Sequence, residues 1–271
     1  MAKAKVGDIN MYYEMHGEGE PFVIINGHGG SVEFLYRTIP VYSGEYQLIL
    51  FDNRGAGRSD TPDTPYTTKM MADDLAGLLD TIGIDSIHLM GISMGGMIAQ
   101  QFALLYAERT RSLILGCTYC QGPDGNLTSE EVAQAKKQMS GLPVDEMMKE
   151  TIRMCVSPKF IQDNPNLIEE LLKQMSIQPV TPHGPVRQMQ AILTHDTYGR
   201  LPEIEAPTLV VHGEVDRVVP VENARIIASR IPGAEMVTFA NTEHIFLEAQ
   251  DEFNSVTLDL LRKHRISVKE A

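Results

Sequence analysis

A Gly-x-Ser-x-Gly stretch at residues 91–95 joins an apolar run to a helical one. Residues 86–90 are short enough for a buried strand, and residues 97–105 carry apolar side chains at helical spacing. A sharp strand-to-helix turn needs small residues beside its central residue, because the backbone folds back on itself there. The stretch therefore predicts a tight turn that holds Ser93 above the end of a strand, at the N-terminus of a helix.

The same alternation of short apolar runs and helical runs continues through most of the chain. We expect strands at 9–15, 22–26, 46–52, 86–91, 111–118, 208–212 and 235–239, and helices at 68–82, 97–105 and 245–263. Strand–helix alternation implies right-handed crossovers and a mainly parallel sheet with helices on both faces. The predicted fold class is therefore α/β, with a mostly parallel central sheet flanked by helices.

Residues 121–200 interrupt this alternation. They contain no short β-branched strand, are rich in methionine, and are broken into short helical stretches by prolines. An insertion between two halves of a sheet, at the edge where ligands bind, predicts a helical cap. We expect a core made of residues 1–120 and 201–271 and a cap made of residues 121–200. The methionines could line an apolar pocket or simply seal the cap onto the core, and none is assigned to a site.

Composition and charge narrow the possible functions. The formal net charge of -13 argues against nucleic acid, whose phosphates need clustered Lys and Arg, and against anionic membrane surfaces. The N-terminus lacks the apolar segment of a secretory signal, and no stretch approaches the roughly 18 apolar residues of a membrane span. Three cysteines make no disulfide framework. We expect a cytoplasmic protein with a small-molecule partner, and the sequence does not indicate its oligomeric state.

A serine nucleophile needs a base that accepts its proton and an acid that orients the base. In a sheet of this kind the chain order is Ser, then Asp or Glu, then His. Asp216 lies on a loop directly after the strand that ends at His212, and His244 follows the last expected strand. Both loops leave the edge of the sheet where Ser93 is expected. The sequence thus predicts Ser93 as nucleophile, His244 as base and Asp216 as acid.

Alternatives exist for both partners of the serine. Glu214 or Asp124 could supply the carboxylate instead. Asp216 is favoured by its place on the loop and by the residues that follow it. His244 competes with seven other histidines, of which His212 ends a buried strand and is interpreted as structural.

The remaining requirement is a pair of backbone N–H groups that face the negative charge of the reacting oxygen. One donor is expected from Met94, the residue after the serine. The other is expected from the glycine-rich turn at 26–31, where His28 occupies the donor position. A phosphate-binding interpretation of this turn fails, because no Lys-Ser or Lys-Thr follows it. The His28 side chain itself could contact substrate or face solvent.

These motifs resemble the α/β-hydrolase superfamily along nearly the whole chain. The resemblance is to the branch of small carboxylesterases, enol-lactonases such as 3-oxoadipate enol-lactonase, meta-cleavage C–C hydrolases and cofactor-free haloperoxidases. The residues that carry it are Asn-Gly-His-Gly-Gly at 26–30, Phe-Asp-Asn-Arg-Gly-Ala-Gly-Arg-Ser-Asp at 51–60, Gly-Ile-Ser-Met-Gly-Gly-Met at 91–97, Gly-Glu-Val-Asp at 213–216 and Glu-His-Ile-Phe at 243–246. The resemblance implies the same triad and the same two amide donors, and no cofactor.

Two positions depart from the pattern of this family. Asn26 stands where the family usually has His, and Glu243 stands where it usually has Gly before the catalytic histidine. A carboxylate at 243 could perturb the histidine or repel anionic substrates, and either effect would narrow the substrate range.

The sequence predicts a serine hydrolase that cleaves a small carboxylic ester through an acyl-enzyme. The alternatives are an enol-lactonase, a C–C bond hydrolase of aromatic degradation, and a non-catalytic ligand receptor of the same fold. Cys117 and Cys120 form one Cys-x-x-Cys pair without the further ligands of a zinc site, so structural burial is expected and no metal is predicted.

Overall fold

The protein is built around one eight-stranded sheet, seen here in a computed structural model that describes residues 2–123, 142–177 and 183–265. The strand order is β1-β2-β4-β3-β5-β6-β7-β8. The strands are β1 (Ala2–Val6), β2 (Ile9–His16), β3 (Glu20–Ile25), β4 (Tyr46–Phe51), β5 (Ile87–Ile92), β6 (Thr110–Gly116), β7 (Thr208–Gly213) and β8 (Glu235–Phe239). Only the pairs β1–β2 and β2–β4 are antiparallel, so the described sheet is mostly parallel and the predicted α/β class is confirmed.

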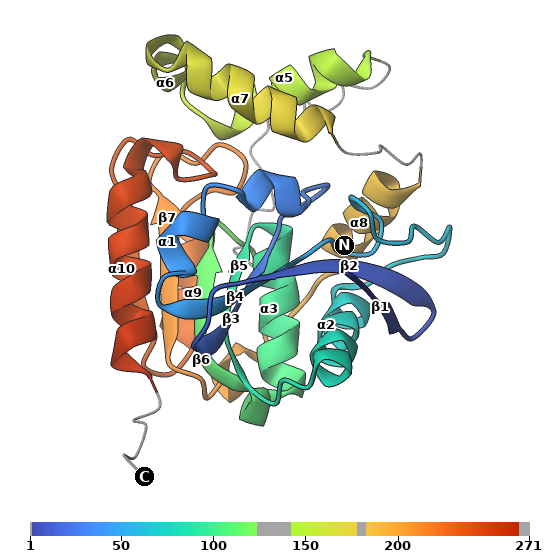
Figure 1. Cartoon of the computed structure of the whole chain (residues 1–271). Coiled ribbons are helices and arrows are strands. Elements are labelled where there is room, and N and C mark those ends of the chain that lie inside the picture. The colour runs from blue at the N-terminus through green and yellow to red at the C-terminus, as the bar shows by residue number, and fades with distance from the viewer. Residues whose placement is uncertain (1, 124–141, 178–182, 266–271) are drawn as a thin grey trace.

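Helices cover both faces of the sheet (Figure 1). The core helices are α1 (Ile39–Tyr42), α2 (Thr68–Ile82), α3 (Met94–Leu105), α9 (Glu222–Arg230) and α10 (Gln250–Lys263), and short 3-10 helices occupy Val32–Leu35, Ala107–Arg109, Leu201–Glu203 and Leu247–Ala249. Val23 and Ile25 of β3 pack in the cluster with α2, α3 and α9, whereas Phe22 and Ile24 pack in the cluster with α1 and α10. Central strands such as β3 and β4 are almost wholly apolar because successive side chains enter opposite clusters, both of them buried.

Among the described residues between β6 and β7 there are four further helices: α5 (Val144–Cys155), α6 (Pro158–Asp163), α7 (Pro165–Ser176) and α8 (Gly184–Leu193). We call them the cap helices. Helices α5, α6 and α7 stand above the sheet in Figure 1 around a small apolar cluster of Ile152, Val156 and Leu171. Helix α8 differs, because its Ala191 and Ile192 join the main core. The boundaries of the cap at 121 and 200 stay a prediction, and Asp124 and Met139 lie outside the described residues.

Some expected elements are wrong in extent. The expected helix at 245–263 begins only at Gln250, since Phe246 adopts φ 57 and residues 247–249 form a 3-10 turn. The expected strand at 111–118 ends at Gly116, because Cys117 turns away at φ 43. Strand β1 and helix α9 were missed. In β1 only Ala4 and Val6 are buried, so Lys3 and Lys5 conceal an edge strand from a search for apolar runs.

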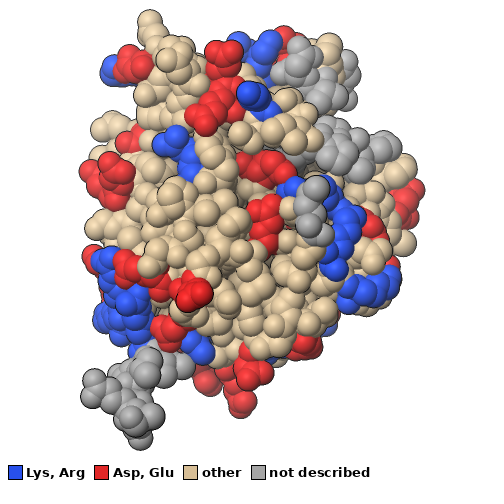
Figure 2. Space-filling view, in the orientation of Figure 1, with Lys and Arg blue, Asp and Glu red and all other residues tan. Residues whose placement is uncertain are grey.

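Positively and negatively charged side chains are mixed on the surface. Lys and Arg side chains are interspersed with Asp and Glu over the face in Figure 2. Near the end of α10, Arg262 and Arg265 pair with Glu45, and Lys263 pairs with Glu235. None of the described helices is long and apolar enough to cross a bilayer.

Candidate active site

Ser93 occupies a strained turn between β5 and α3. Its φ of 57° and ψ of -122° lie outside the regions that a residue with a side chain normally adopts. Two hydrogen bonds hold it there: its N–H donates to Gly116 O at 2.8 Å, and Thr118 Oγ1 donates to its carbonyl at 2.7 Å. The expected turn is therefore present, and the end of neighbouring strand β6 and the residues after it hold it in place.

The flanking glycines are required by close backbone contacts. A Cβ on Gly91 would lie 2.2 Å from Gly95 O, and a Cβ on Gly95 would lie 2.1 Å from Ile25 O. Both contacts are with main-chain atoms, which cannot move aside as a side chain can. The glycine spacing in the sequence thus reflects the packing of the turn against β3 and against itself.

Asp216 and His244 meet as the sequence predicts. His244 Nδ1 donates to Asp216 Oδ2 at 2.8 Å, while Asp216 Oδ1 accepts the N–H groups of Val218 at 2.8 Å and Val219 at 2.9 Å. The Asp216 carboxylate is fully buried. Burial alone raises the pKa of Asp216, but the facing histidines outweigh it and lower the pKa overall. The carboxylate is thus ionised at neutral pH and fixes Nδ1–H of His244, which leaves Nε2 to act as a base.

The alternative acids do not share this position. Glu214 accepts a hydrogen bond from Thr238 Oγ1 at 2.8 Å at an exposed site, rather than from a histidine. Asp124 lies outside the described residues, so the structure does not compare it with Asp216.

A second histidine contacts the same carboxylate and was missed as a site residue. His212 Nε2 lies 3.2 Å from Asp216 Oδ2 and 2.8 Å from Val219 O. Both partners are acceptors, so Nε2 carries the proton and is shared between them. His212 is buried as expected, yet its structural role is to support the candidate acid. Its position four residues before Asp216, at the end of β7, was the only sequence signal for this contact.

Cys117 lies beneath this pair. Its Sγ, an Asp216 oxygen and a His244 nitrogen all lie within 4.8 Å of one another, a grouping that could ligate a metal ion. Burial raises the pKa of the Cys117 thiol well above its ordinary value, and the charge of Asp216 adds to the effect. A protonated thiol is a poor metal ligand, and the other two groups already bond to each other. The chemistry of these residues therefore fits a Ser–His–Asp arrangement better than a metal centre.

The glycine-rich turn lies directly against Ser93. A Cβ on Gly27 would sit 3.3 Å from Ser93 Cβ and 3.8 Å from its Oγ. Asn26 Nδ2 donates to Ser31 O at 2.8 Å and closes the turn from within. The departure at Asn26 thus supplies an internal brace for the turn whose Gly27 lies against the serine.

Both expected amide donors belong to segments next to Ser93. Met94 is the first residue of α3, and N–H groups in the first turn of a helix have no partner within the helix. His28 follows Gly27 in the turn that faces Ser93. Their use as an oxyanion hole remains a prediction.

The side chain of His28 has a role that sequence analysis did not consider. Its Nε2 donates to Pro185 O of α8 at 2.8 Å, so it contacts a cap helix. Gly29 N–H donates to Gln188 Oε1 at 2.8 Å, and Gln188 Nε2 donates to Arg54 O at 2.8 Å. Helix α8 therefore also holds the glycine-rich turn, in addition to its internal brace.

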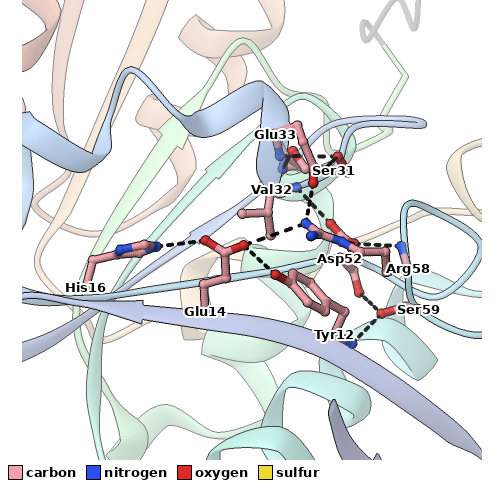
Figure 3. A network of polar contacts seen from close by, with 10 residues as sticks. Tyr12, Glu14, His16, Ser31, Val32, Glu33, Asp52, Arg58 and Ser59 are labelled. Atoms are coloured by element: carbon pink, nitrogen blue, oxygen red, sulfur yellow. Dashed lines mark hydrogen bonds and ion pairs between the residues drawn. The ribbon is translucent and has the colours of Figure 1, made fainter. Parts of the chain in front are cut away.

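A polar network supports the same turn from below (Figure 3). Buried Asp52 accepts the N–H groups of Val32 and Arg58, each at 2.7 Å. Arg58 pairs with Glu33 and stacks on the Tyr12 ring, with its guanidinium carbon 3.5 Å from the ring centre. These contacts connect the turn at 26–32 to the turn at 53–60 and to β2. Arg58 therefore braces these loops, and Arg54 of the same turn pairs with Asp8 and Asp74.

Glu243, the second departure from the family pattern, is buried and paired. Its Oε1 accepts from Arg217 Nε at 2.8 Å, and its Oε2 accepts the Arg217 N–H at 3.2 Å. Burial raises the pKa of Glu243, and Arg217 offsets only part of this rise. The carboxylate is thus engaged by the residue next to Asp216 rather than directed at substrate.

Known proteins resemble the chain over nearly its whole length. A family model described as alpha/beta hydrolase fold matches residues 20–250. A 2-hydroxy-6-oxo-6-phenylhexa-2,4-dienoate hydrolase of Comamonas testosteroni is 31% identical across 97% of this chain and 95% of its own length. A putative carbamate hydrolase RutD of Azorhizobium caulinodans is 29% identical across 95% of this chain and 97% of its own. The solved structure of a thermophilic esterase from Thermogutta terrifontis has a TM-score of 0.82 at 26% identity, covering 98% of this chain and 100% of its own.

Proposed function

Because the chain belongs to the α/β-hydrolase family, we propose that it is a serine hydrolase that cleaves a small carboxylic ester through an acyl-enzyme. The observation that carries this proposal is the 2.8 Å bond between His244 Nδ1 and buried, ionised Asp216. This bond fixes the tautomer in which Nε2 can accept a proton from a serine.

The proposed reaction has two halves. Ser93 Oγ attacks the ester carbonyl while His244 Nε2 takes the hydroxyl proton, and the resulting oxyanion accepts hydrogen bonds from the Met94 and His28 N–H groups. His244 then passes the proton to the leaving alcohol as the C–O bond breaks. Water, deprotonated by His244, attacks the acyl-enzyme, and the carboxylic acid leaves Ser93 with its hydroxyl restored.

The buried negative charge of Asp216 lowers the energy of the imidazolium that forms in each half. His212, Val218 and Val219 keep this carboxylate in place by donating to it. The strained turn holds the Ser93 backbone in one conformation, so little reorganisation of the nucleophile is needed during the proposed reaction.

The test is hydrolysis of p-nitrophenyl acetate and butyrate by the wild type and by Ser93→Ala. We expect turnover by the wild type and a loss of roughly a thousandfold or more in the variant, because Ser93 Oγ forms the acyl-enzyme in the proposed reaction. Ser229→Ala on α9 is the matched control and should retain full activity. No turnover by the wild type would favour the ligand-receptor alternative, and turnover that survives Ser93→Ala would refute the proposed nucleophile.

A second candidate is C–C bond hydrolysis of a ring-fission ketone, which the name of the 31% identical Comamonas testosteroni relative favours. An enol-lactone would be opened by the same steps as an ester, and the name of the 29% identical relative adds carbamates to the possible acyl substrates. A panel of esters of increasing acyl length, lactones, a carbamate ester and a ring-fission ketone separates these classes. We expect the highest kcat/KM for an ester, and a higher value for the ketone would transfer the proposal to the second candidate.

A further inference from the structure

The loops that carry Asp216 and His244 pack on each other backbone to backbone. Val215 N–H donates to Thr242 O at 3.2 Å. A Cβ on Gly213 would lie 2.2 Å from Thr242 O and 2.5 Å from Glu243 O. A displacement of one loop would therefore displace the other, so the positions of Asp216 and His244 depend on each other.

Arg217 joins this pair of loops to the cap. Its Nε and N–H bind the Glu243 carboxylate, while its Nη2 donates to Arg153 O at 3.0 Å and to Val156 O at 3.4 Å. These carbonyls belong to the last turn and the C-cap of α5, where carbonyl groups have no partner within the helix. A guanidinium at this end also complements the helix dipole. One side chain thus bridges the acid loop, the base loop and a cap helix.

A second set of contacts reaches the same part of the cap from the base loop. Glu248 Oε1 accepts the N–H of Ser157 at 2.8 Å, and its Oε2 lies 3.5 Å from Glu243 N. Ile245 and Leu247 pack against the apolar cluster of the cap helices. The residues on both sides of His244 are therefore held by the cap, through the turn between α5 and α6 and through the apolar cluster.

From these contacts we infer that Arg217 and Glu243 are positioning residues, which hold Asp216 and His244 in register by anchoring both loops on the C-terminal end of α5. This inference rests on the proposed serine-hydrolase function of the same site. The pair does not touch the reacting atoms. It acts on catalysis through the geometry of the base, so its loss should lower kcat and leave KM for a neutral substrate nearly unchanged.

The experiment measures how fast a fluorophosphonate labels Ser93, a readout that does not depend on the natural substrate. Labelling of the wild type but not of Ser93→Ala establishes the activated serine, and its failure would refute the proposed function itself. In Arg217→Met we expect labelling to slow by about tenfold, since small displacements of catalytic groups have effects of this size or larger. Arg217→Lys keeps the positive charge but lacks the planar guanidinium with its several N–H donors, so it should give an intermediate labelling rate.

A double-mutant cycle tests whether the two residues act as a pair. Glu243→Gln should also slow labelling. The double variant should be no slower than Arg217→Met, because the first substitution already removes the ion pair that the second would remove. For p-nitrophenyl butyrate the loss should fall on kcat rather than KM.

The control pair is Arg225 and Glu222, which also form an ion pair but lie exposed on α9. Arg225→Met and Glu222→Gln should label at the wild-type rate. Where Arg217→Met does not fold, Arg217→Lys and Glu243→Gln carry the test. Wild-type labelling by the Arg217 and Glu243 variants, even with a lower Tm, would show a purely structural role and overturn the inference, and additive losses would refute the pairing.

Discussion

Replacing Asp216 by Asn is the most demanding test of the proposed triad. The substitution preserves size, and the Asn carbonyl oxygen can still accept the two N–H groups of Val218 and Val219 that now bind Oδ1 at 2.8 and 2.9 Å. The amide NH2 must then occupy the position of Oδ2, 2.8 Å from His244 Nδ1 and 3.2 Å from His212 Nε2. There it is a donor where both histidines need an acceptor.

The expected loss follows from this mismatch. His244 can accept a hydrogen bond from this NH2 only if Nδ1 carries no proton. The proton of the neutral ring then lies on Nε2, which can no longer act as the base that Ser93 needs. In a triad this tautomer change lowers kcat by about 10^4, equal to roughly 5 kcal/mol of activation free energy. His212 faces the same NH2 with its own Nε2–H, so we also expect a lower free energy of unfolding, by about 1–3 kcal/mol.

The assay is kcat for p-nitrophenyl butyrate, with the fraction of folded protein fixed from urea unfolding curves at the same temperature. Glu214→Gln is the matched control, because this acidic residue lies on the same loop and bonds to Thr238 instead of a histidine. A loss of less than about tenfold in kcat for Asp216→Asn, or a larger loss for Glu214→Gln, would refute the reasoning.

Two further predictions concern stability. Gly95→Ala should lower the free energy of unfolding by about 3 kcal/mol or more, because its Cβ would lie 2.1 Å from Ile25 O, whereas Gly44→Ala has nothing within 4 Å and should change it by less than about 1 kcal/mol in urea titrations. Equal stability of the two variants would contradict this. Burial lowers the pKa of His195 to about 3, below that of the unfolded chain, so the unfolded state binds the extra proton and stability should fall by about 1.4 kcal/mol per pH unit from near pH 6 towards pH 3. In His195→Gln the free energy of unfolding, measured from pH 7 to pH 4, should depend less steeply on pH. An unchanged slope would show that other groups cause the pH dependence.

Much of the fold could be predicted from local patterns. Seven of the strands and the helices after Thr68 and Ser93 leave an apolar periodicity in the sequence, because their side chains enter the two buried clusters. Strand β1 and the late start of α10 could not be read in this way. Strand β1 buries only every second residue. The start of α10 depends on Phe246, whose positive φ lets the His244 loop turn before the helix begins.

The contacts around the candidate site were less predictable than its principal residues. Ser93, Asp216 and His244 follow from turn chemistry and from their places after strands of one sheet. His212 is interpreted from the sequence as structural, because a spacing of four residues from Asp216 does not by itself indicate that a strand-end histidine shares its proton with that carboxylate. His28 and Pro185 are separated by most of the chain, and no local pattern relates a turn to the start of a distant helix.

The sequence by itself determined the α/β alternation, the strained serine turn and the places of the proposed nucleophile, acid and base after strands of one sheet, since each depends on backbone conformation and side-chain period over a few neighbouring residues. Only the tertiary structure decided what holds these groups in register: His212 on the acid, α8 on the glycine-rich turn, and Arg217 between Glu243 and the end of α5. The physical reason is that hydrogen bonds and ion pairs of this kind form between whichever polar groups packing brings within about 3 Å, and packing of distant segments leaves no period in the sequence.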